Sequence, residues 1–174
     1  LVEGFYAAGE CSCVSVHGAN RLGANSVLEA LFFGRHVGAN IAKDLKDGDI
    51  KLGEVSEADA NPAIERIEAL RTSNGDERVP ELRKELQQSM TDNAGVFRTE
   101  KSLLEQKEKI KELKARYKNI RLDDKSTVYN TDVQEAIELG HMLDFSAFIV
   151  EGAILRKESR GAHYREEHQT RDDE

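Results

Sequence analysis

The feature that most constrains the fold is the stretch 49–159, where apolar residues recur at helical spacing within a strongly charged sequence. Charged residues make up 33% of the chain and aromatic residues only 6%, with no Trp and two Pro. Such a composition suits long solvated helices better than a sandwich of short strands. We therefore predict a mainly α chain, built as an antiparallel helical bundle with a spectrin-repeat-like three-helix core.

Capping residues mark where four helices of this bundle begin. Asn61-Pro62 and Pro80 place a proline in the first turn of the first two helices. Thr99 can cap the third helix, and Thr131 with Gln134 forms a capping box for the fourth. The fourth helix is apolar on several faces, so we expect it to lie at the centre of the bundle.

The region before the bundle has a different pattern. Gly4 to Gly9 reads as a short buried strand, and a loop rich in Gly, Ser and Asn follows it. Residues 26–46 have the pattern of a helix that Asn25 or Ser26 can cap. The composition changes at residues 46–50, so we predict domains at 1–48 and 49–159. Residues 160–174 begin a charged C-terminal segment, and 156–174 taken alone reads as a solvated tail.

Charge, apolar run length and cysteine count exclude several functions. The formal net charge is −8 and no basic stripe is present, so we expect no nucleic-acid partner. The longest apolar runs are far shorter than the roughly 20 residues of a membrane-spanning helix. Cys11 and Cys13 are too close for an easy disulfide and two ligands short of a zinc site, so we interpret them as reduced cytosolic thiols and predict no metal.

Two separated motifs carry a family resemblance. Residues 17–26 read His-Gly-Ala-Asn-Arg-Leu-Gly-Ala-Asn-Ser, and residues 157–163 read Lys-Glu-Ser-Arg-Gly-Ala-His, with Arg-Asp-Asp at 171–173. The first run resembles the flavin- and substrate-contacting loop of the succinate dehydrogenase and fumarate reductase flavoproteins, whose relatives include L-aspartate oxidase. The second resembles a later signature of the same family. The resemblance covers essentially the whole chain and implies a C-terminal fragment: the remnant of an FAD-binding domain followed by a helical domain.

Four residues of the first motif are candidates for binding. The planar fork of Arg21 can hold a carboxylate through two charge-assisted hydrogen bonds, and the resemblance implies that it binds the dicarboxylate substrate. Glu10 can accept hydrogen bonds from cofactor hydroxyls, and the resemblance assigns this position to FAD. Ser26 and Val27 begin a helix whose N–H groups can face an electron-rich flavin atom. The alternatives are an ordinary loop carboxylate at Glu10 and a simply capped helix at residues 26–27.

The histidines of the two motifs have structural rather than chemical interpretations. We interpret His17 as structural, because the substrate-binding histidine that the resemblance implies lies outside this chain. We expect His163, with Arg160 and Arg165, to make structural contacts to the FAD domain.

The resemblance implies a parent subunit that transfers a hydride between FAD and the central carbons of succinate or fumarate. It also implies an iron-sulfur partner subunit, and a cytoplasmic location peripheral to the inner membrane through partner subunits. The chain has no Gly-x-Gly-x-x-Gly after a strand, so we expect it alone to be inactive, to retain no FAD and to hold no catalytic residue. The alternatives are a fragment of an L-aspartate oxidase-type flavoenzyme, which the second motif disfavours, and a non-catalytic helical interaction module.

Overall fold

A computed structural model describes residues 2, 4–17, 21–48, 50 and 53–173. The chain divides into two compact units, Leu1–Val55 and Ser56–Glu174. The division falls a few residues after the change in composition that we used to place the boundary. The functional roles that we assigned to the predicted domains stay predictions.

The first unit consists of a loop region and the long helix α1, Asn25–Asp47. The helix is present as predicted, but the predicted cap is wrong. Its N-cap is Ala24, whose φ of 67° is left-handed, and no side chain caps the helix. Asn25 lies inside the first turn instead, because the backbone turns into the helix one residue earlier. At the other end Gly48 adopts a φ of 78° and its N–H bonds the carbonyl of Asp44.

The predicted strand at residues 4–9 is not formed. Residues 5–8 have no regular secondary structure, and Phe5 is 76% exposed. A strand needs a neighbouring strand to satisfy its backbone N–H and C=O groups. The described residues of the first unit include no such neighbour, which explains why this prediction is wrong.

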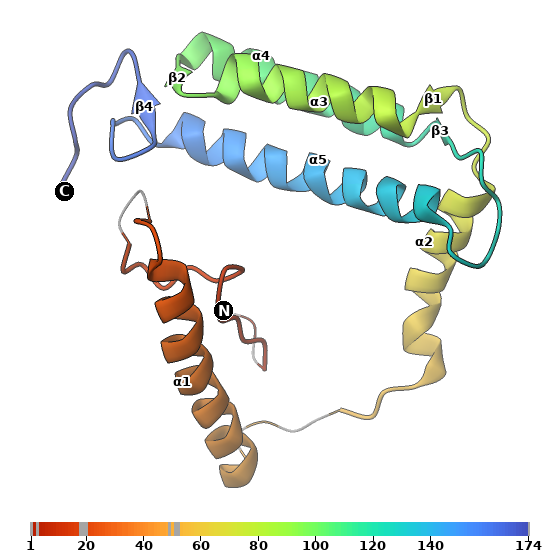
Figure 1. The fold of residues 1–174 in the computed structure, drawn as a ribbon, viewed down its shortest axis with the longest axis horizontal. Coiled ribbons are helices and arrows are strands. Elements are labelled where there is room, and N and C mark those ends of the chain that lie inside the picture. The colour runs from red at the N-terminus through yellow and green to blue at the C-terminus, as the bar shows by residue number, and fades with distance from the viewer. Residues whose placement is uncertain (1, 3, 18–20, 49, 51–52, 174) are drawn as a thin grey trace. The chain divides into compact units, whose positions relative to one another are not determined.

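The second unit is a helical bundle (Figure 1). A short 3₁₀ turn, Glu57–Ala60, leads into α2, Asn61–Thr72, and three longer helices follow: α3, Val79–Ala94; α4, Glu100–Tyr117; and α5, Thr131–Leu155. Figure 1 shows α4 running antiparallel to both α3 and α5, and these three helices pack against one another. The structure thus confirms the predicted three-helix core. None of the helices in the described part of the chain is long and apolar enough to cross a membrane.

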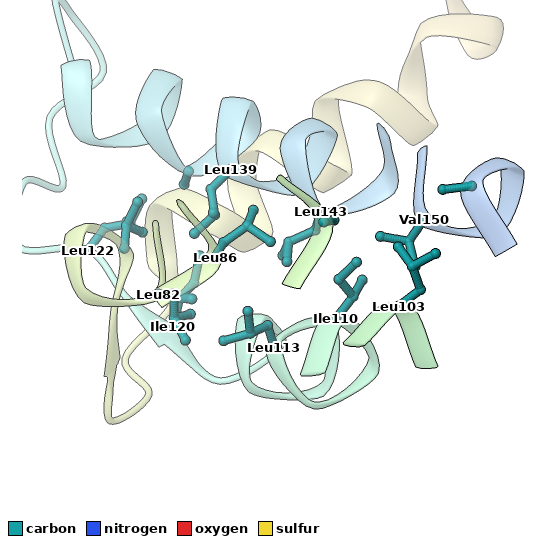
Figure 2. Close-up of a cluster of buried hydrophobic side chains, with 14 residues drawn as sticks. Leu82, Leu86, Leu103, Ile110, Leu113, Ile120, Leu122, Leu139, Leu143 and Val150 are labelled. Carbon is teal, nitrogen blue, oxygen red and sulfur yellow. The ribbon is translucent and has the colours of Figure 1, made fainter. Parts of the chain in front are cut away.

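The core lies between α3, α4 and α5 (Figure 2). Its largest buried apolar side chains are Leu82, Leu86, Leu103, Ile110, Leu113, Ile120, Leu139, Leu143 and Val150. Burial of each such side chain stabilises the fold by roughly 1.5–3 kcal/mol before the cost of ordering the chain. Helix α5 contacts α2, α3 and α4, in line with the central position we expected. Its opposite face is open, however, since Phe145 and Phe148 are 67% and 73% exposed.

The cap of α4 was predicted correctly, and the cap of α5 was not. At α4, Thr99 Oγ1 accepts a hydrogen bond from Ser102 N at 3.0 Å, which confirms the predicted cap. At α5 the cap is Asn130, whose Oδ1 accepts from Val133 N at 3.0 Å. The predicted box of Thr131 and Gln134 is wrong, because the asparagine one residue earlier already satisfies the first turn.

Two short parallel strand pairs close the ends of the bundle (Figure 1). At one end β1, Glu77–Arg78, pairs with β3, Ile120–Arg121. At the other end β2, Phe97–Arg98, pairs with β4, Tyr164–Arg165. Because β4 belongs to the C-terminal segment, the second pair ties that segment to the turn between α3 and α4.

The C-terminal segment is therefore not a solvated tail, and that interpretation is wrong. Arg165 is fully buried at 0% exposure. Its guanidinium donates to the carbonyl of Ala153 at 2.8 Å and to Glu100 Oε2 at 2.6 Å. The carbonyls at the end of α5 and the carboxylate at the start of α4 thus accept hydrogen bonds from the two Nη groups of a charge that would otherwise stay in water.

Candidate functional site

The four predicted binding residues lie in the first unit, in the loop before α1 and in its first turn. Glu10 is exposed, and it follows Gly9, whose φ of 85° makes the tight turn that presents it. Glu10 makes no hydrogen bond or ion pair with another described residue. Its carboxylate is free to accept hydrogen bonds from a ligand's hydroxyl groups.

Arg21 is exposed and faces no carboxylate within the described residues. The one hydrogen bond described for its guanidinium runs from Nη1 to the carbonyl of Leu22 at 3.3 Å. An arginine carries five N–H donors in a planar fork, so most of its donor capacity is open to an incoming carboxylate.

The N-terminus of α1 offers backbone N–H groups without a capping side chain. Val27 N donates to the carbonyl of Ala24 at 3.2 Å, so that group is already engaged. Ser26 N has no partner among the described residues, and the partial positive charge of the helix end adds to its donor strength. This end of α1 can therefore donate a hydrogen bond to an electron-rich group from Ser26 N, whereas Val27 N is already engaged.

A buried carboxylate that our sequence analysis missed, Glu29 of α1, contacts this loop. Glu29 of α1 is 8% exposed, and its Oε2 lies in short contact with Nε2 of His17. Ser12 Oγ lies 3.3 Å from Glu29 Oε1 and 2.7 Å from the carbonyl of Gly9. These contacts fit the structural interpretation of His17. The available signal was that Glu29 is the only polar residue in the helical stretch 27–33.

A hollow of about 340 Å³ lies beside this carboxylate. Its lining combines His17 and Glu29 with apolar side chains of α1, and it consists of Val16, His17, Asn25, Leu28, Glu29, Phe32 and Phe33. Leu28 and Phe32 are 67% and 62% exposed, so the apolar face of α1 has no cover among the described residues.

The described residues contain no cluster of three or more His, Cys, Asp or Glu side chains that could hold a metal ion. Cys11 and Cys13 are exposed free thiols.

The densest charge network lies in the second unit and joins helices rather than forming a ligand site. Arg116 of α4 donates to Glu77 Oε1 at 2.7 Å and to Glu85 Oε2 at 2.8 Å. The Arg116 hydrogen bond is the main cause that lowers the pKa of Glu85 to about 2, and Lys109 adds to it. Each carboxylate of this network has a cation beside it, so we infer that the network stabilises the packing of the helices.

The second motif is likewise occupied by contacts inside its own unit. His163 lies 3.0 Å from Arg98 Nη1 through Nδ1 and 3.0 Å from the carbonyl of Arg156 through Nε2. Because the arginine and the carbonyl fix one donor and one acceptor, the ring is held neutral, and burial lowers the pKa of His163. The FAD-domain contact that we expected of His163 stays a prediction.

Comparison with known families gives two matches. The C-terminal domain of the fumarate reductase flavoprotein matches residues 83–174, which is more than half of the chain. An FAD binding domain matches residues 1–27, the range that holds Glu10, Arg21, Ser26 and Val27.

Individual relatives agree with these matches. The succinate dehydrogenase flavoprotein subunit of Rickettsia bellii is 43% identical over 99% of this chain. The fumarate reductase flavoprotein subunit of Haemophilus influenzae is 41% identical over 99% of it. The chain spans 29% of the length of each of these relatives.

Solved structures of related proteins have the same fold over nearly the whole of this chain. A quinol-fumarate reductase determined with menaquinol molecules superposes with a TM-score of 0.89 and 38% identity, over 99% of this chain and 30% of its own. The Mycobacterium smegmatis Sdh1 complex in its apo form gives a TM-score of 0.82 and 35% identity, over 96% of this chain and 28% of its own. With a family match over more than half of its length, the chain belongs to the fumarate reductase flavoprotein C-terminal family.

Proposed function

We propose that this chain is part of a flavoprotein subunit that interconverts succinate and fumarate with FAD. The observation that carries the proposal is the loop that ends in α1. It presents an open arginine fork at Arg21 beside a helix N-terminus without a capping side chain, within the range that matches an FAD binding domain. The names of the relatives, succinate dehydrogenase and fumarate reductase, support the choice of substrate.

Each of the predicted residues has a defined role in this proposal. FAD, when bound, supplies the hydride acceptor or donor. The carboxylate of Glu10 accepts hydrogen bonds from its hydroxyl groups, and Ser26 offers a backbone N–H, with Val27 beside it, to the electron-rich end of the ring. Arg21 holds one carboxylate of the dicarboxylate and fixes the distance over which the hydride moves.

The partners follow from the same family. We propose that the complete subunit works beside an iron-sulfur subunit and lies at the inner membrane through its partner subunits. Two solved relatives support an assembly of this kind, since one is a quinol-fumarate reductase and the other is described as a complex. Our expectation that the chain alone is inactive and retains no FAD stays a prediction.

The test of this function is Arg21→Lys in the complete subunit. Lysine keeps the charge but loses the planar fork, which removes roughly 1.5–3 kcal/mol of charged hydrogen bonding. Misplacement of the substrate adds a loss of up to about 100-fold, because hydride transfer depends on close alignment. We expect turnover of succinate or fumarate to fall at least about 100-fold, while flavin content stays near that of the wild type.

Arg35→Lys is the matched control, because Arg35 is an exposed arginine of α1 without a described partner. We expect it to leave turnover unchanged. If Arg21→Lys retains turnover within about threefold of the wild type, Arg21 does not hold the substrate and the proposed role is wrong.

A further inference from the structure

We infer that Glu29 is a positioning residue: it fastens the binding loop to α1 and thereby fixes where Arg21 presents its fork. The inference rests on the proposed function for the role of Arg21. It rests on the geometry of the first unit alone for the role of Glu29.

The burial of Glu29 needs an explanation. A carboxylate that is 8% exposed loses most of its hydration, which is costly unless the protein supplies hydrogen-bond partners. Here the partner at Oε2 is His17 from the loop, and the Ser12 hydroxyl lies 3.3 Å from Oε1. An ionised carboxylate only accepts hydrogen bonds, so His17 must donate from Nε2. Because Glu29 is buried, loss of the His17 hydrogen bond costs free energy, and that cost holds the loop to the helix.

The two contacts lie at separate points of the loop. Ser12 has one hydroxyl proton, and the nearer acceptor is the carbonyl of Gly9 at 2.7 Å, so Ser12 closes the turn that presents Glu10 and packs beside the carboxylate. His17 lies four residues before Arg21 in the sequence, and Arg21 lies four residues before the first helical residue, Asn25. In the sequence, Arg21 therefore lies between two anchored points, His17 at Glu29 and Asn25 at the start of α1.

This arrangement predicts that Glu29 acts on the substrate through Arg21. In the complete subunit we expect Glu29→Ala to lower dicarboxylate turnover about 10- to 100-fold, because a displaced arginine misaligns the substrate. Glu29→Gln keeps an acceptor oxygen for His17, so we expect it to retain most of the activity. Asp47→Ala is the matched control, since Asp47 is an exposed carboxylate of the same helix without a described partner.

A double-mutant cycle separates positioning from general damage to the fold. If Glu29 acts through Arg21, Glu29→Ala should cost less than about threefold once Arg21→Lys is already present. If the two losses multiply instead, Glu29 does not act through Arg21 and the inference is wrong.

A second measurement uses the complete subunit and needs no activity. The ring nitrogen signals of His17 in a long-range ¹H–¹⁵N spectrum report its hydrogen bond to Glu29. We expect Glu29→Ala to shift them, and Glu29→Gln and Asp47→Ala to shift them much less. An unchanged His17 signal in Glu29→Ala would overturn the contact itself. A wild-type subunit that turns over no dicarboxylate would overturn the proposed function, while the His17 spectrum would still decide whether Glu29 fastens the loop.

Discussion

The two units use apolar helices in opposite ways. In the second unit, α3, α4 and α5 turn their apolar side chains toward one another, and every buried apolar side chain described for the protein lies in that unit. In the first unit the one buried residue of α1 is Glu29, while Leu31 and Phe32 are 70% and 62% exposed. Similar amphipathic sequences thus give a packed core only where other helices of the same unit cover them. The second unit contains its own core, and the first contains the residues that we propose bind ligands.

The largest expected effect comes from separating the units. We expect residues 56–174 to unfold cooperatively, with a free energy of unfolding of about 5–15 kcal/mol, the range of ordinary domains. Residues 1–55 should show weak helicity without a cooperative transition, because a single helix without a packing partner is marginal in water. Circular dichroism during urea titration measures both. A cooperative transition in residues 1–55, or a random-coil spectrum from 56–174, would reverse the comparison.

A smaller effect is expected within the second unit at Arg165. Replacement by Met keeps much of the volume but removes the hydrogen bonds to Glu100 and to the end of α5. Hydrogen bonds to charged groups contribute roughly 1.5–3 kcal/mol each, so we expect a loss of about 3 kcal/mol in the free energy of unfolding. Arg171→Met is the control, because the Arg171 side chain is 62% exposed. Equal urea midpoints for the two variants would show that the C-terminal segment does not contribute to the bundle.

The smallest effect compares two glycines of α5. A Cβ at Gly140 would lie 2.9 Å from the hydroxyl oxygen of Tyr117, whereas a Cβ at Gly152 would meet nothing within 4 Å. Gly140→Ala should therefore lower the free energy of unfolding by about 1–3 kcal/mol. Gly152→Ala should raise it by about 0.5–1 kcal/mol, because alanine favours the helix. Thermal unfolding of both variants measures the difference, and shifts of the same sign would contradict the packing of Tyr117 against α5.

Local patterns were sufficient to predict the helices of both units. Apolar spacing and first-turn prolines depend on neighbouring residues, so the bundle and the Thr99 cap followed from the sequence. Features that depend on distant residues did not follow. The strand at residues 4–9 needed a pairing partner, and the burial of Arg165 depends on Glu100, 65 residues away. The cap of α5 was wrong by one residue, because Asn130 and Thr131 are both good capping residues.

The candidate site shows the same limit. Arg21, Glu10, Ser26 and Val27 were predicted from one short stretch of sequence, and no described residue forms an ion pair with Glu10 or Arg21. Glu29 was missed because its role depends on the loop folding back onto α1, which no spacing rule describes. The available clue was an acidic residue on an apolar helix, which by itself predicts a solvated side chain as readily as a buried one.

The contact between Arg165 and Glu100 has a consequence for the synthesis of the chain on the ribosome. Glu100 emerges 65 residues before its partner, and ribosomes add about 5–20 residues per second. Glu100 of α4 is therefore without Arg165 for roughly 3–13 s. During that time β2 also lacks its partner β4, and the end of the bundle stays open to other strands. The bundle can therefore be completed only after residue 165 has emerged, and a ribosome that stalls between residues 100 and 165 leaves this edge exposed to chaperones and proteases.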